Sequence, residues 1–203
     1  MPKKKYHFVL YKFKKLLLYL HIVKTKNYLT KPFFCMKKVL IILLFVNVVH
    51  GFSYAQDDKF KALFIYNFTK YMEWPEAKHA GDFKIGVLGN SPITNELKAF
   101  TAKKTVGQQK IVVEEILAIA DCPKYHIVFV PAKSSSNVVE ITQLVANKGV
   151  LVVTDKPGLA VEASGINFIK DDGQQTFEIS VKHINEQGVK AGKSLLSLGN
   201  TIE

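Results

Sequence analysis

Residues 126–131 read HIVFVP and residues 150–153 read VLVV, and these two apolar stretches decide the fold of the chain. A half-exposed strand alternates apolar and polar residues, whereas both of these stretches are apolar almost throughout. A continuous apolar run is expected when both faces of a strand are covered, as in the interior of a parallel sheet. We therefore predict two central strands, at His126–Val130 and Val150–Val153, with helices packed on both of their faces.

The segments around these strands alternate between strand and helix patterns. Further strands are predicted at Phe83–Leu88 and Lys110–Glu115 from their apolar content. A helix is predicted over residues 91–102, because a serine followed by a proline suits a helix start. A second helix is predicted over Ser136–Asn147, where apolar residues recur at helical spacing.

The C-terminal part of the chain has the pattern of a hairpin. Gly165–Ile169 and Thr176–Val181 flank a turn at residues 171–173, Asp-Asp-Gly, which favours two antiparallel strands. A closing helix is predicted over Lys190–Leu198. The whole pattern predicts an α/β fold: a mainly parallel sheet, helices on both faces in a Rossmann-like three-layer arrangement, and a C-terminal antiparallel hairpin.

An aromatic-rich segment precedes the first strand. Asp57–Trp74 is predicted to be an amphipathic helix, because apolar residues from Phe60 onward recur at helical spacing and Pro75 stops the helix. Its aromatic face either covers the sheet or serves a protein partner, since tryptophan and tyrosine are common interface anchors.

Residues 36–55 have the three parts of a signal peptide. Two lysines follow Met36, an apolar run extends from Val39 to Val46, and small residues precede Gln56. We predict export to the periplasm with cleavage before Gln56, and an uncleaved membrane anchor is the alternative. Residues 1–35 are then an upstream extension that is not part of the fold, and residues 56–203 form a single α/β domain.

The positive charge of the chain belongs to the leader. The formal net charge is +11, but residues 1–55 hold eleven lysines and no acid. Residues 56–203 hold the other 17 lysines and all 17 acids, and the chain has no arginine. A nucleic-acid-binding domain usually has a surplus of basic residues and uses arginine forks, so nucleic-acid binding is not expected.

No metal-ligating or catalytic set emerges from the residues after position 55. The histidines at positions 79, 126 and 183 are far apart, without the spacing of metal ligands, and no cofactor is predicted. Cys122 precedes an apolar strand, where burial would make its thiol a poor nucleophile. A thiol enzyme using Cys122, with His126 or His183 as base, is one alternative class.

A small-ligand receptor is a second alternative. In open parallel sheets, ligands bind outside the carboxyl ends of the strands. Such a pocket is expected near residues 89–91, residues 131–134 and Asp155, and Asn90, Ser91 and Ser134 are the candidate ligand-binding residues. The glycine-rich fingerprints of dinucleotide and P-loop sites are missing, so the ligand class stays open.

Several segments, in order, make the chain resemble the YfiR/HmsC family of exported regulators. The opening helix ends in Trp-Pro, KALFIYNFTKYMEWP (61–75), and the first strand and its turn read IGVLGNSP (85–92). Cys122 precedes an apolar strand, IVFV (127–130). The hairpin strands read GINFI (165–169) and TFEIS (176–180), and a Ser-x-x-Leu-Leu segment, GKSLLSL (192–198), closes the series.

This resemblance implies a periplasmic, non-enzymatic regulator. Such proteins restrain an inner-membrane diguanylate cyclase by binding its periplasmic sensor part, which lowers cyclic-di-GMP signalling, and they are typically homodimers. We expect Tyr71, Trp74 and Lys193 to contact the partner. Ser180 stands where family members often have asparagine, and Cys122 has no partner for the internal disulfide of some members.

Overall fold

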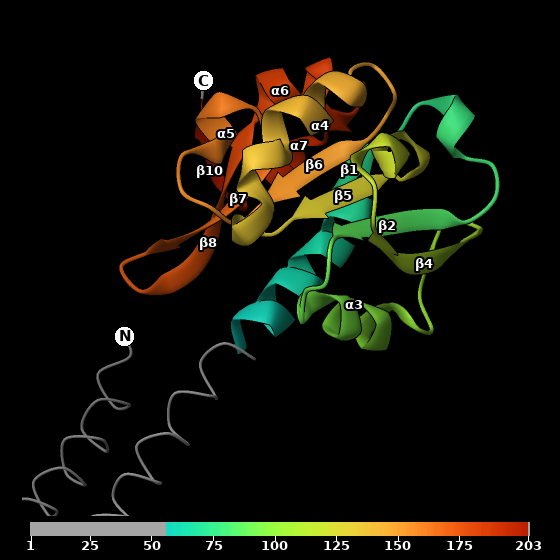
Figure 1. The fold of residues 1–203 in the computed structure, drawn as a ribbon, viewed down its shortest axis with the longest axis horizontal. Coiled ribbons are helices and arrows are strands. Elements are labelled where there is room, and N and C mark those ends of the chain that lie inside the picture. Colours follow the sequence, from blue (N-terminus) through green and yellow to red (C-terminus); the bar gives the residue numbers. More distant parts are fainter. Residues whose placement is uncertain (1–55, 203) are drawn as a thin grey trace, which may run out of the picture. The chain divides into compact units, whose positions relative to one another are not determined.

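A mainly parallel eight-stranded sheet forms the centre of the computed structural model, which describes residues 56–202 (Figure 1). Its strands lie in the order β10-β8-β7-β6-β5-β2-β4-β3. In chain order they are β2 (Phe83–Leu88), β3 (Thr105–Val106), β4 (Gln109–Ile116), β5 (Ile127–Val130), β6 (Leu151–Thr154), β7 (Ile166–Asp171), β8 (Gln174–Ser180) and β10 (Asn200–Ile202).

In the order of the sheet, the neighbouring strands β4, β2, β5, β6 and β7 run parallel, and an antiparallel pair lies on each side of this group. On one side β7 and β8 form the predicted hairpin, paired from Ile166 with Ile179 to Asp171 with Gln174. On the other side β3 pairs antiparallel with β4. The terminal strand β10 adds to β8 in parallel. The predicted fold class, a mainly parallel α/β sheet with a C-terminal hairpin, is confirmed.

The two central strands bury side chains on both faces, as their apolar runs predict. In β5, Ile127 and Phe129 belong to one core cluster, whereas Val128 and Val130 belong to another. In β6, Leu151 and Val153 belong to the first cluster, whereas Val152 belongs to the second. Because side chains alternate across a strand, the two clusters lie on opposite faces of the sheet.

Different helices cover the two faces (Figure 1). The helix over residues 56–71 and α3 (Ile93–Thr101) supply apolar residues to the first cluster, together with α7 (Lys193–Leu196). On the second face lie α4 (Val138–Leu144), α5 (Leu159–Glu162) and the 3-10 helix η2 (Ile119–Lys124). Helix α6 (Val181–Glu186) follows β8 directly.

The predictions of the opening and closing helices are wrong where the two segments pair with each other. The opening helix ends at residue 71 rather than at Trp74, and Met72–Glu73 forms a short strand, β1. The predicted closing helix Lys190–Leu198 is instead strand β9 (Lys190–Ala191), the short helix α7, and a turn into β10. Strands β1 and β9 pair antiparallel and form a separate two-stranded sheet.

Three smaller boundaries also differ from prediction. Helix α3 begins at Ile93 with Pro92 at its N-cap, and no side-chain cap bond forms, so Ser91 is not the cap. Residues 132–137 form a 3-10 helix, η3 (Ala132–Asn137), before α4, which already ends at Leu144. The second hairpin strand ends at Ser180, because its hydroxyl accepts a bond from the backbone N–H of His183 and starts α6.

The predicted signal peptide at residues 36–55 and the upstream extension at residues 1–35 lie outside the described residues. Within residues 56–202, no helix is both long enough and apolar enough to cross a membrane.

Candidate protein-binding surface

The structure brings Tyr71 next to the C-terminal segment that carries Lys193. The backbone N–H of Gly192 donates to the carbonyl oxygen of Tyr71 at 2.8 Å, in line with the β1–β9 pairing. A side chain at position 192 would collide, since a Cβ there would lie 2.8 Å from that oxygen. Glycine therefore permits this approach, and it places two of the three predicted partner-binding residues side by side.

Trp74, the third predicted contact residue, is half-buried against the sheet. Its ring meets Phe83 edge to face with centroids 5.0 Å apart. Its indole N–H donates to the carbonyl oxygen of His126 at 3.3 Å. Trp74 therefore has a structural role, and because it is only half-buried, part of the residue stays at the surface. We name this region, comprising Tyr71, Trp74 and Lys193, the Trp74 surface.

A small cleft of about 290 Å³ lies beside Trp74. Its walls include the apolar side chains of Met72 and Phe83, and Glu73 and His79 contribute exposed polar groups. An aromatic edge over an apolar floor with a polar rim is the usual composition of a protein contact site. The cleft therefore suits an apolar side chain supplied by a partner.

Buried polar groups hold the floor of the Trp74 surface in place. His126 stacks on Phe83 with centroids 4.3 Å apart. Its Nδ1 accepts from the backbone N–H of Lys84 at 3.0 Å, and its Nε2 donates to the carbonyl oxygen of Lys78 at 2.8 Å. Burial lowers the pKa of His126, so the ring is neutral near pH 7.

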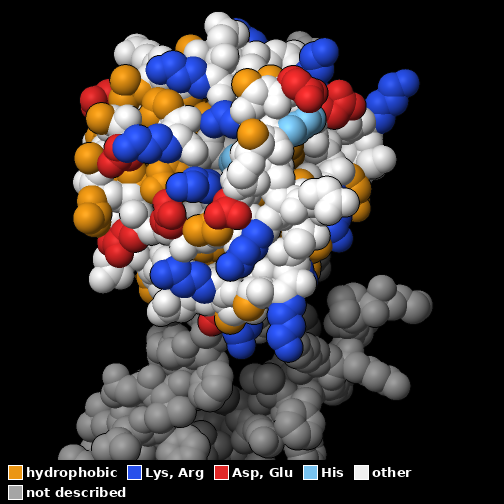
Figure 2. All heavy atoms as spheres, turned by 90° about the vertical axis from the view of Figure 1, so that its right-hand side faces the viewer, with side chains coloured by type: hydrophobic (Ala, Val, Ile, Leu, Met, Phe, Trp, Pro, Cys, Tyr) orange, Lys and Arg blue, Asp and Glu red, His pale blue; other side chains and the backbone are white. Residues whose placement is uncertain are grey.

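Charged side chains of both signs lie on the face of the molecule shown in Figure 2. Lysine and acidic side chains are interspersed there rather than gathered into a field of one sign. At the Trp74 surface itself, Lys193 is exposed and has no ion pair with any residue in the range 56–202. It is therefore free to meet an acidic group of a partner.

The predicted ligand-binding residues meet at the carboxyl ends of β2 and β5. Asn90 is exposed, whereas Ser91 and Ser134 are half-buried. The ammonium group of Lys133 donates to the carbonyl oxygen of Asn90, which joins the two loops. Neither the cleft beside Trp74 nor the larger groove described below is lined by these residues.

A buried ion pair that the sequence did not indicate closes the same edge of the sheet. Lys61, from the opening helix, reaches Asp155 after β6 with 2.6 Å between Nζ and Oδ2, and their side chains are 13% and 14% exposed. Burial raises the pKa of the neighbouring Asp58, against the opposing effect of Lys61. The other Asp155 oxygen, Oδ1, and the Thr94 hydroxyl are buried without a hydrogen-bond partner among the described residues.

Cys122 lacks the surroundings of a catalytic thiol. It is fully buried in the second core cluster, and burial raises its pKa to about 11. His126 cannot act as its base in this arrangement, because both ring nitrogens are bonded to backbone groups. His183 contacts the carbonyl oxygen of Ala160 through Nδ1. The geometry therefore gives no support to a thiol enzyme.

The fold is a three-layer α/β domain in which the half-buried Trp74 lines a cleft at the surface. Residues 58–200 match the YfiR/HmsC-like family, and the chain belongs to that family. Among proteins with curated descriptions, none matches the chain.

One solved structure shares part of the arrangement. It is described as the ABC domain in complex with L-Trp from Streptococcus pneumonia, with a TM-score of 0.43 and 11% sequence identity. The likeness covers 59% of this chain and 55% of that chain, so this chain spans only about half of its length. Such a distant likeness bears on neither the fold nor the function of this protein.

Proposed function

We propose that this protein is a periplasmic, non-enzymatic binding module that restrains a membrane signalling protein, a diguanylate cyclase or similar sensor, through its periplasmic part. The observations that carry the proposal are the half-buried Trp74 with an apolar cleft beside it, and the exposed Lys193 next to the Gly192 that bonds to Tyr71. Membership of the YfiR/HmsC-like family supports the same role.

The mechanism is a shift in population. A bound regulator can favour the inactive state of its partner only if it binds that state more tightly than the active one. The partner would place an apolar side chain in the cleft beside Trp74 and an acidic group near Lys193. A homodimer of the regulator, as in the family, would present this surface twice.

The proposal includes an exported chain. Residues 36–55 act as a signal peptide, cleavage occurs before Gln56, and residues 1–35 lie upstream of the true start at Met36. N-terminal sequencing of the periplasmic protein should begin at Gln56, and peptides from residues 1–35 should be missing from the precursor. A protein that starts at residue 1 or keeps residues 36–55 would contradict this organisation.

Affinity capture from solubilised membranes tests the regulatory role. The tagged exported protein should retain a transmembrane protein with a cyclase or kinase domain, identified by mass spectrometry. Lys193→Glu reverses a charge at the Trp74 surface and should weaken capture, because repulsion replaces attraction. Lys182→Glu, at an exposed lysine of α6, is the matched control and should capture normally.

Cyclic-di-GMP should rise in cells that carry Lys193→Glu and stay unchanged with Lys182→Glu. Equal capture of the membrane partner by both variants would show that Lys193 is not part of the partner contact. Capture of no membrane signalling protein by the parent chain would overturn the proposed function.

A second candidate, a periplasmic small-ligand receptor, is favoured by one observation. Asp155 Oδ1 and the Thr94 hydroxyl are buried, and neither has a hydrogen-bond partner within residues 56–202, near the loops that carry Asn90, Ser91 and Ser134. Polar groups in such a position can be satisfied by a polar ligand. Calorimetry against a metabolite panel should then give a ligand whose affinity falls in Asp155→Asn, whereas the regulator proposal expects no such ligand.

A further inference from the structure

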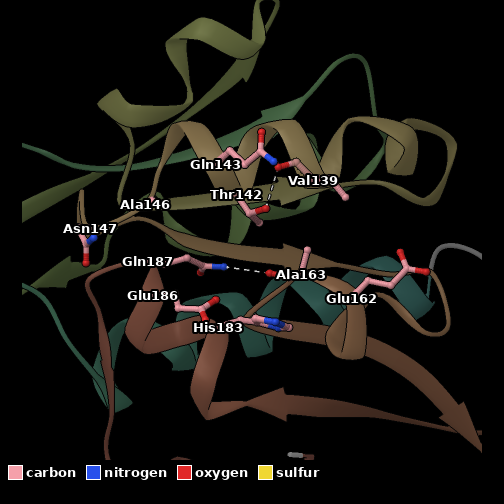
Figure 3. A pocket seen from close by; sticks show the side chains of 10 residues that line it. All are labelled: Val139, Thr142, Gln143, Ala146, Asn147, Glu162, Ala163, His183, Glu186 and Gln187. Carbon is pink, nitrogen blue, oxygen red and sulfur yellow. Dashed lines mark hydrogen bonds between the residues drawn. The ribbon is translucent and has the colours of Figure 1, made fainter.

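A groove between α4 and α6 is the larger of the two hollows described for this protein (Figure 3). Its volume is about 440 Å³, within the range of roughly 300–1,000 Å³ that is usual for sites of small organic ligands. It shares no lining residue with the cleft beside Trp74. The groove is therefore a separate feature, and neither the sequence patterns nor the proposed function uses it.

Fixed side chains form the floor of the groove. Gln187 is 2% exposed, and its Oε1 accepts from the backbone N–H of Val152 at 2.9 Å. Its Nε2 donates to the carbonyl oxygen of Ala163 at 3.4 Å, a bond drawn in Figure 3. Alanines at positions 146 and 163 leave the space above this amide open. The hollow is thus built into the packing of the helices.

His183 presents one ring nitrogen for a further bond. Its Nδ1 lies 3.0 Å from the carbonyl oxygen of Ala160, which can only accept, so Nδ1 carries the hydrogen in this contact. In the neutral ring Nε2 is then an acceptor, and no bond to it is made by the described residues. His183 is 9% exposed, so its ring is held firmly at the wall of the groove.

The remaining polar groups make the groove rich in acceptors. Glu162 and Glu186 line it, and neither forms an ion pair with a residue in the described range. Thr142 donates its hydroxyl hydrogen to the carbonyl oxygen of Val139 at 2.9 Å, which leaves its lone pairs for a ligand. No lysine lines the groove. Two carboxylates without a cation favour a positively charged occupant rich in N–H donors.

We propose that this groove binds a small organic cation, a ligand of amino-acid size that carries an ammonium or guanidinium group. A positive group would lie beside Glu186 and donate to His183 Nε2, and a second positive group of a longer ligand would lie beside Glu162, at the other end of the groove in Figure 3. The methylene chain of the ligand would lie against the alanine and valine side chains of the walls. This binding is independent of the proposed regulatory role, because the two sites share no residue.

Calorimetric titration of the exported protein tests the proposal with cadaverine and agmatine as probes. At least one should bind saturably with one ligand per chain. The diol 1,5-pentanediol, which replaces both ammonium groups of cadaverine by hydroxyls, should not bind. Amide chemical shifts in nitrogen-15 spectra should change at α4 and α6 rather than at the Trp74 surface.

Variants of the groove separate a specific site from general attraction. Glu162→Gln with Glu186→Gln should weaken binding by about tenfold, and Ala146→Phe should fill the hollow and abolish it. Glu140→Gln, at an exposed acid of α4 that does not line the groove, is the matched control. An unchanged melting temperature in each variant shows that the fold is intact.

Three results would overturn the proposal. They are the absence of saturable binding by either cation at millimolar concentration, equal binding by the diol, and equal binding by the double glutamine variant. Failure of these tests would leave the capture of a membrane partner through Lys193 unaffected, so the two proposals fail separately.

Discussion

At the scale of single residues, Trp74 combines a structural role with a predicted contact role. Trp74→Phe keeps an aromatic ring against Phe83 but removes the donor to the His126 carbonyl oxygen. We expect a loss of about 1 kcal/mol in the free energy of unfolding, the usual value of one hydrogen bond. Trp74→Ala also removes the ring contacts and should cost about 3 kcal/mol.

Equilibrium unfolding in denaturant measures both losses. A Trp74→Ala variant as stable as the parent would show that the ring is not packed in solution, and the residue would then serve only the surface. Because the two roles overlap, Lys193→Glu is the sharper test of partner binding.

Cys122 is expected to be chemically silent in the folded protein. Its pKa is raised to about 11 by burial, so very little thiolate exists at neutral pH. In the exported protein that begins at Gln56, iodoacetamide should leave the folded chain unlabelled at neutral pH and should label Cys122 rapidly once denaturant unfolds it, as measured by intact mass. Rapid labelling of the folded protein would restore the thiol-enzyme alternative.

At the scale of elements, the contact between Gly192 and Tyr71 joins the two ends of the described chain. Gly192→Ala would place a Cβ 2.8 Å from the Tyr71 carbonyl oxygen and force the β1–β9 pair apart. Overpacking of this kind typically costs about 1–3 kcal/mol. Ser194→Ala, at an exposed residue of α7, should change the unfolding free energy by less than about 0.5 kcal/mol.

Thermal unfolding of the two variants, compared with the parent, checks this prediction. A Gly192→Ala protein with parental stability would mean that the β1–β9 sheet adjusts freely. In that event the Trp74 surface would be less rigid than the described contacts indicate.

The element scale also shows where sequence patterns are ambiguous. Lys190–Leu198 has apolar residues at spacings that a helix can use, yet only Lys193–Leu196 is helical. Lys190 and Ala191 pair with β1, more than one hundred residues away in the chain. A local pattern carries no information on a partner so distant, so tertiary pairing overrides the local preference.

At the scale of the whole molecule, His126 makes stability depend on pH. Burial lowers its pKa below the ordinary value of about 6.5, so between these pKa values the unfolded chain binds a proton that the folded chain does not. The free energy of unfolding should therefore fall as the pH is lowered from about 7 to 5. The contribution of the neutral His126 ring to stability is present above the pKa that this histidine has in the unfolded chain, and it is lost as the pH falls below that pKa.

Denaturant unfolding at several pH values measures how the free energy of unfolding changes with pH. His126→Gln should lower stability overall and weaken the dependence of the free energy of unfolding on pH. A parental slope in His126→Gln would assign the pH dependence to other groups.

The sequence by itself determined the layered sheet. Strand β2 lies at Phe83–Leu88, where it was predicted, and the runs at β5 and β6 are buried on both faces. The reason is physical: burial on both faces requires apolar side chains at every position, and this requirement is visible in any short window of the sequence. The order of the matching segments likewise indicated the YfiR/HmsC-like family.

Only the tertiary structure decided how the sites are assembled. The hydrogen bond from Gly192 to Tyr71, the Lys61–Asp155 ion pair and the groove between α4 and α6 all join residues that are distant in the chain. Each depends on side chains that meet only after the sheet and its helices have packed. Glu162, His183 and Glu186 have no motif spacing, so no pattern in the sequence could have selected them before the helices placed them around one hollow.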